Sequence, residues 1–68
     1  MILKLYNNLV QIHDGDNFEE IKMIESKNYK LQHIIDNGLH QLDILAYDEV
    51  IAQISSNNLV IIDNRNML

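Results

Sequence analysis

The fold is decided by one stretch near the N-terminus, which reads Asp14-Gly15-Asp16-Asn17-Phe18-Glu19-Glu20-Ile21. Asp16 is suited to cap a helix, because its carboxylate can accept a hydrogen bond from a backbone N–H in the first turn. Glu19, three residues later, can accept one from the backbone N–H of Asp16 in return. Phe18 and Ile21 then recur at helical spacing, which predicts that both side chains face inward to the core, and acidic residues lie at the positive end of the helix dipole. The stretch therefore predicts a short helix over about residues 17–25.

The residues before this stretch predict a β-hairpin. Segments 2–6 and 9–13 are short and rich in apolar residues, and Val10 and Ile12 alternate with polar neighbours as a half-buried strand requires. Asn7-Asn8 between them suits a tight turn.

The residues after the stretch predict a second helix and then a strand. Leu31, Ile34 and Ile35 have helical spacing, and Asn37-Gly38 is a typical helix end. Beyond it, the alternation of Leu42, Ile44 and Ala46 favours a strand over a helix. The next apolar residues could also line a helix: Tyr47, Val50, Ile51 and Ile54.

The last apolar run is rich in β-branched residues and predicts a strand: Leu59, Val60, Ile61 and Ile62. Two arrangements are open for it. The run forms a protected hairpin with residues 50–54, or it is an exposed edge strand through which another chain can bind.

These elements together predict one α+β domain over residues 1–68. The alternative is an all-β meander of six strands, because turn-prone clusters fall about every ten residues. The absence of threonine, the low count of three valines and the acidic stretch with its cap favour the α+β fold.

Composition excludes several classes of function. The chain is short, has no cysteine, and carries a net charge of −5 with Arg65 as its only arginine. Disulfide scaffolds and cysteine-bound zinc are therefore excluded, and a surface for nucleic acid lacks its cations. No apolar run approaches the ~18 residues of a membrane span, and the opening residues lack the pattern of a signal peptide.

Three stretches resemble parts of a LysM domain. In residues 9–21 a strand runs into Gly15-Asp16 and then into a helix with an inward isoleucine. Residues 31–38 resemble the second LysM helix with its terminal asparagine. Residues 43–54 resemble the closing segment, with Tyr47-Asp48 where the family turns on Pro-Gly.

The resemblance implies a βααβ core over about residues 9–54, with an added strand at 1–6 and a C-terminal strand and tail at 57–68. In size the chain is most similar to the tail protein X family of contractile-tailed phages, which are small LysM-like proteins without a signal peptide. The resemblance implies a non-enzymatic adaptor of a phage tail or related injection apparatus, made in the host cytoplasm and carried in the virion. Its partners would be other tail or baseplate proteins, in an oligomeric assembly.

Two further functions stay open. A LysM module binds peptidoglycan or chitin in a shallow groove, which the resemblance places at Asp16, Asn17, Gly38, Leu39 and His40. Alternatively, the net charge of −5 suits a small acidic inhibitor that binds a basic partner protein.

No catalytic, cofactor or metal site is predicted. The acidic residues between positions 14 and 20 do not have the spacing of an EF-hand loop. His13, His33 and His40 have no zinc-like spacing, and the serines lack the motif that exposes a nucleophile.

Overall fold

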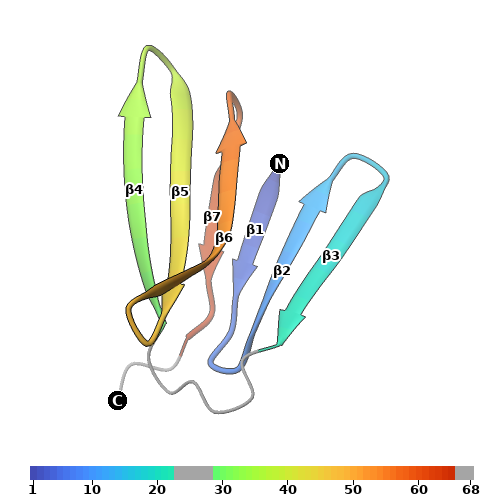
Figure 1. Ribbon diagram of the computed structural model, residues 1–68. Coiled ribbons are helices and arrows are strands. Elements are labelled where there is room, and N and C mark those ends of the chain that lie inside the picture. The colour runs from blue at the N-terminus through green and yellow to red at the C-terminus, as the bar shows by residue number, and fades with distance from the viewer. Residues whose placement is uncertain (23–28, 66–68) are drawn as a thin grey trace. The chain divides into compact units, whose positions relative to one another are not determined.

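The computed structural model of the protein describes residues 1–22 and 29–65, which are all-β (Figure 1). They form seven strands: β1 (Ile2–Leu5), β2 (Leu9–Asp14), β3 (Asn17–Lys22), β4 (Lys30–Asp36), β5 (Leu39–Ala46), β6 (Glu49–Ser56) and β7 (Val60–Asp63). The described residues separate into two compact units, one of residues 1–22 and 59–65 and the other of residues 29–58. Within them, no helix is long and apolar enough to cross a membrane.

The first unit is a sheet with the strand order β3-β2-β1-β7. β1 pairs with β2 and β2 with β3 in antiparallel fashion, whereas β7 lies parallel to β1. Two backbone hydrogen bonds extend the parallel pairing: the N–H of Val60 donates to the carbonyl of Met1, and that of Asn64 donates to the carbonyl of Leu5. The two ends of the described chain therefore meet in one sheet.

Alternation along β1 and β2 builds the core of this unit. Leu3 pairs with Ile12 and Leu5 with Val10, so the four side chains share one face of the sheet, and all four are buried. The hairpin predicted for residues 2–13 is confirmed. Its turn closes on a hydrogen bond of 2.9 Å from the N–H of Tyr6 to the carbonyl of Leu9.

The helix predicted for residues 17–25 is wrong. Residues 17–22 are strand β3 and pair with β2, and residues 23–25 lie outside the described residues. The two residues Gly15-Asp16 form the hairpin turn between Asp14 and Asn17, with Gly15 at a φ of 61°. A glycine with positive φ in the first central position is typical of a type II′ turn, which reverses the chain before Asp16 can cap a helix. Phe18, predicted to be in the core, is 53% exposed.

The second unit is an antiparallel sheet with the order β4-β5-β6. On one face, Leu42 of β5 pairs with Ile54 of β6, and Ile44 lies two residues along from Leu42. These three side chains are buried, as is Tyr29 just before β4. The strand predicted from the alternation of Leu42, Ile44 and Ala46 is confirmed as β5.

The second predicted helix is also wrong, because residues 30–36 form strand β4. Asn37-Gly38 does not end a helix but joins β4 to β5, with Asp36 paired to Leu39. Both turn residues have positive φ, 51° and 79°, which is the geometry of a type I′ hairpin turn. An Asn-Gly pair is the preferred sequence for that turn, so local turn chemistry outweighs the helical spacing of the apolar residues.

The described residues therefore have an all-β fold, and the predicted α+β fold with a LysM-like βααβ core is wrong. The alternative of a six-strand meander has the right class but not the topology: the described strands number seven and form two sheets. β7, predicted as the last strand, is not a hairpin partner of residues 50–54. It pairs with β1, while β6 pairs with β5.

The turn between β5 and β6 has the type I′ backbone without the residues that favour it. Tyr47 and Asp48 have φ values of 54° and 62°. A left-handed conformation costs a residue other than glycine, asparagine or aspartate about 1–2 kcal/mol, so Tyr47 carries most of the cost at this turn.

We expect the double substitution Tyr47→Asn with Asp48→Gly to raise the free energy of unfolding by about 1 kcal/mol, because Asn-Gly adopts this backbone readily. Chemical denaturation of the two proteins measures the difference. A fall in stability would show that the Tyr47 side chain contributes more than the backbone strain costs.

Candidate functional site

The outer strands of both sheets carry most of the exposed apolar side chains. The described residues include nine exposed large hydrophobic side chains, of which seven lie on the edge strands β3, β7, β4 and β6: Phe18, Ile34, Ile35, Val50, Ile51, Val60 and Ile62. A sheet edge offers unpaired backbone N–H and carbonyl groups, and apolar side chains beside them favour pairing with another strand. The edges are therefore the first candidates for a binding site.

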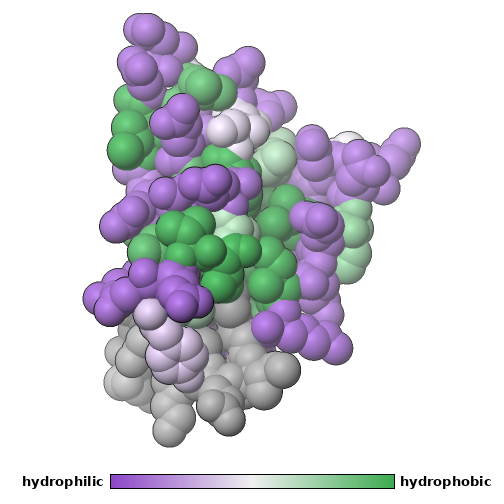
Figure 2. Space-filling view, viewed as in Figure 1, coloured by the Kyte–Doolittle hydropathy of each residue, from purple (hydrophilic) through white to green (hydrophobic). Residues whose placement is uncertain are grey.

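Strand β4 has the most exposed of these side chains. Ile34 is 62% exposed and Ile35 60%, and in Figure 2 hydrophobic surface interrupts the hydrophilic surface beside the end of β4. Residue pairs between β4 and β5 are alternately hydrogen-bonded and non-hydrogen-bonded, and the pair next to the turn, Asp36 and Leu39, is hydrogen-bonded. In each non-hydrogen-bonded pair, the backbone N–H and carbonyl of the β4 residue point to the other side of the strand. The backbone groups of Leu31, His33 and Ile35 therefore point away from β5. Within the described residues, β4 has no strand on that side.

Sequence reasoning did not predict β4 as a candidate edge, because residues 31–37 were interpreted as a helix. One signal could have identified it. Asn37-Gly38 is flanked on both sides by apolar runs, and this is a strong local signal for a hairpin.

Strand β7 contains three of the four residues predicted for an edge interface. Val60 and Ile62 are exposed, Ile61 is half-buried, and Leu59 lies just before the strand. Just after β7, the Arg65 guanidinium donates two hydrogen bonds to the Asp63 carboxylate, from Nε to Oδ1 at 3.0 Å and from Nη2 to Oδ2 at 2.8 Å. These bonds, with a third from the Arg65 backbone N–H, lower the pKa of Asp63 below its usual value.

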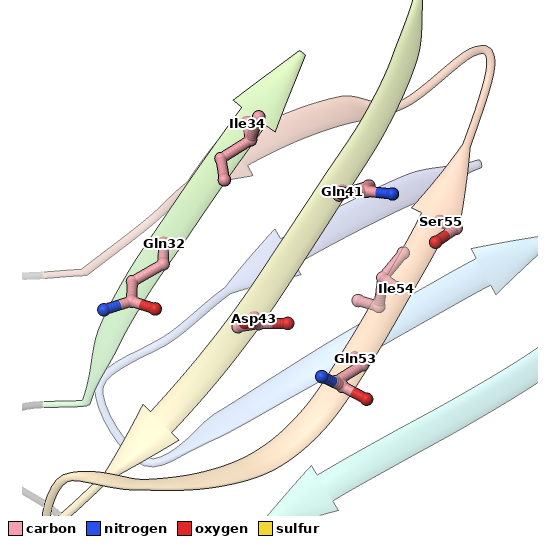
Figure 3. Close-up of a pocket in the computed structure, with 7 residues that line it drawn as sticks. All are labelled: Gln32, Ile34, Gln41, Asp43, Gln53, Ile54 and Ser55. Atoms are coloured by element: carbon pink, nitrogen blue, oxygen red, sulfur yellow. The ribbon is translucent and has the colours of Figure 1, made fainter. Parts of the chain in front are cut away.

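A shallow hollow of about 280 Å³ lies on one face of the second sheet (Figure 3). Two cross-strand rows form most of it, Gln32-Asp43-Gln53 and Ile34-Gln41-Ser55. The amides can donate and accept hydrogen bonds and the carboxylate can accept them. Among the described residues, no aromatic ring on which a sugar could stack lines the hollow. Its chemistry suits weak contact with a polar surface.

A second hollow, of about 320 Å³, lies beside the β2–β3 turn of the first unit. It is lined by Met1, Ile12, Asp14, Asn17, Phe18 and Glu19. The Phe18 ring lies 4.8 Å from the ring of His13, at an angle of 54°. Nε2 of His13 is buried and has no hydrogen-bond partner among the described residues.

The residues predicted for a glycan groove fall into two sets. Asp16 lies in the β2–β3 turn and Asn17 begins β3, in the first unit. Gly38 lies in the β4–β5 turn, and Leu39 and His40 begin β5, in the second unit. Neither set lies beside a helix, since residues 1–22 and 29–65 contain none.

The described residues contain no group of three or more histidine and acidic side chains able to hold a metal ion. His33 and His40 are nevertheless brought together, with Nε2 of His33 2.9 Å from Nδ1 of His40. The pair was not predicted, because Asn37-Gly38 was interpreted as a helix end and not as the hairpin turn that sets the register of β4 and β5.

Comparisons with protein-family models, with curated proteins and with solved structures found no match to this chain.

Proposed function

We propose that the protein is a non-enzymatic assembly module in which β4 pairs with β4 of a second copy. One observation carries the proposal: the strand with the most exposed apolar side chains is an edge strand whose sequence is complementary to itself in antiparallel pairing. Such pairing adds the two three-stranded sheets into one continuous sheet. This mode of binding relies on backbone hydrogen bonds for affinity and on side chains for register.

The register follows from the sequence of the strand, Lys-Leu-Gln-His-Ile-Ile-Asp. With two copies antiparallel and His33 at the symmetry axis, Lys30 of each copy lies opposite Asp36 of the other, and Leu31 opposite Ile35. The outward backbone groups of Leu31, His33 and Ile35 then form three hydrogen-bonded pairs, with about six hydrogen bonds. Opposite charges and apolar side chains that face each other across strands stabilise a sheet.

The other edges are less suited to self-pairing. On β3, Asn-Phe-Glu-Glu-Ile-Lys, the backbone groups of Glu20 point away from β2, and the same operation with Glu20 at the symmetry axis places it opposite Glu20 of the second copy. Like charges in that position destabilise the pair. Strand β7 is only four residues long, and its terminal Asp63 is already held by Arg65. Strand β6 has a register shift between its pairs at Ala52 and Val50, and a bulge of this kind turns an edge strand away from a partner. Symmetric pairing therefore favours β4.

Assembly through an edge strand is the part of the phage-tail interpretation that this proposal keeps. The virion location, the tail and baseplate partners, the binding of peptidoglycan or chitin and the inhibition of a basic partner all stay predictions from the sequence. The support for self-pairing is independent of them, because it comes from the exposure and charge pattern of β4.

Charge reversal tests the register. We expect Lys30→Glu to weaken the dimer about tenfold, because two symmetric attractions become repulsions with Asp36. Adding Asp36→Lys should restore the dimer. The two positions are about 20 Å apart on one strand, so they do not compensate each other within one copy. Sedimentation velocity over a range of protein concentrations measures the dimer fraction.

A second test places a lysine on the β4 edge. We expect Ile35→Lys to disrupt the dimer, because it puts a positive charge among the apolar side chains of the pairing. The matched control is Ile62→Lys, which puts the same positive charge on the β7 edge and should leave the dimer intact. Circular dichroism verifies that each variant is folded. A wild-type protein that stays monomeric at millimolar concentration, or a Lys30→Glu dimer as tight as the wild type, would overturn the proposal.

A further inference from the structure

The pair of histidines on the second sheet has the spacing of two ligands of one metal ion. His33 on β4 pairs with Leu42, and His40 on β5 pairs with Ile35, so the two rings are diagonal neighbours on one face. Their facing nitrogens are 2.9 Å apart, and the ring planes are inclined by only 19° with centroids 5.1 Å apart. The rings therefore meet edge to edge through their nitrogens.

The distance between these nitrogens indicates which coordination geometry fits. Two imidazole nitrogens that each lie about 2.0 Å from a metal ion are about 2.8 Å apart at a right angle and about 3.3 Å apart at the tetrahedral angle. The separation of 2.9 Å is that of the hydrogen bond between the rings, and because it is close to the right-angle value, chelation at that angle needs little change in the distance between the nitrogens. Neighbouring ligands in the square-planar or tetragonal complexes of Cu(II) and Ni(II) have this angle.

We infer that His33 and His40 chelate one divalent transition-metal ion, with Cu(II) bound most tightly. Binding replaces the hydrogen bond between the rings. The ring that donates this bond moves its proton to its other nitrogen, so that both facing nitrogens carry a lone pair, and each ring then tilts until its lone pair points at an ion beside the line that joins the nitrogens. His33 is exposed, so its ring has room to turn. The neighbouring β4–β5 turn holds the two strands in register.

The strength and order of binding follow from the ligand set. Since no group of three candidate ligands exists among the described residues, two protein ligands hold the ion and water completes its coordination. For nitrogen ligands the affinity rises from Mn(II) through Ni(II) to Cu(II) and falls again at Zn(II). The site is therefore a moderate-affinity chelate on the sheet surface.

The test is a titration of the full chain with Cu(II), followed by calorimetry and by NMR of the histidine ring signals. We expect the paramagnetic ion to broaden the signals of His33 and His40 first. His13 is the internal control, because its described ring contact is with Phe18 and not with a second imidazole, so its ring signals should persist after those of the pair have broadened. His33→Asn and His40→Asn should each lower the affinity at least tenfold, and Mn(II) should bind far more weakly than Cu(II).

The result does not depend on the β4 dimer, because both ligands come from one chain. The titration is therefore repeated on the Lys30→Glu variant, in which self-pairing is weakened, and we expect the chelate to stay in place because Lys30 lies on the opposite face of β4 from His33. Wild-type affinity in both asparagine variants, or first broadening at His13, would overturn the inference. Circular dichroism with and without metal separates loss of the ligand from loss of the fold.

Discussion

Replacement of Leu42 with alanine is expected to lower the free energy of unfolding by about 2–5 kcal/mol. The Leu42 side chain is fully buried and pairs across the sheet with Ile54, which is also buried. Removing it loses apolar burial and leaves a cavity in a small core. Since the stability of a small domain is only a few kcal/mol, the variant should be partly unfolded at room temperature. Urea denaturation followed by circular dichroism measures the loss.

The control for this substitution is Phe18→Ala. The Phe18 ring is 53% exposed and its one described aromatic neighbour is His13, so the loss should stay below about 1 kcal/mol. A helix over residues 17–25 would reverse the order, because Phe18 would then be a core residue. A larger loss for Phe18→Ala than for Leu42→Ala would contradict the strand assignment of residues 17–22.

Replacement of Gly38 with alanine is expected to cost about 1–2 kcal/mol. Gly38 has a φ of 79°, in the left-handed region that alanine rarely adopts. A Cβ atom at this position would have no heavy atom within 4 Å, so the cost comes from the backbone and not from a clash.

The matched variant is Gly38→Asn, which adds a larger side chain but tolerates positive φ. We therefore expect it to lose less than half as much stability as Gly38→Ala in thermal unfolding. Equal losses for the two variants would show that backbone strain at this turn is not the cause.

The strands that could be predicted are those where alternation and turn chemistry agree. Val10 and Ile12 alternate with polar residues next to Asn7-Asn8, and both pack in the core as predicted. Leu42 and Ile44 likewise alternate and are buried. A period of two over several residues distinguishes a half-buried strand from a helix.

The two predicted helices failed for a physical reason that their sequences share. Asp16 with Glu19 is a capping pattern, but Gly15-Asp16 is also a two-residue hairpin turn. Phe18 and Ile21 have helical spacing, yet as residues of β3 they lie on opposite faces of the sheet, one exposed and the other half-buried. In so short a segment, pairing with β2 outweighs local helix propensity.

The candidate site could be predicted only in part. The apolar run at residues 59–62 indicated an edge strand, because it is too apolar to be a loop and follows a turn-prone cluster. The contact of His33 with His40 follows from the Asn37-Gly38 turn, which fixes the register of β4 on β5, and it was missed because that turn was interpreted as a helix end. That β4 lies at the edge of its sheet depends on which strands pair, and this leaves no short-range pattern.

The parallel pairing of β1 with β7 has a consequence for how the chain folds. Ile2 pairs with Val60, so almost the whole sequence must be made and brought into a loop before this ladder can form. The hairpins of β4, β5 and β6 need only local contacts and can form within microseconds. Closing a long loop lowers the conformational entropy of the chain before the contacts between the strands can form and offset that loss. Non-local pairings of this kind therefore slow folding. The docking of β7 is therefore the natural candidate for the rate-limiting step.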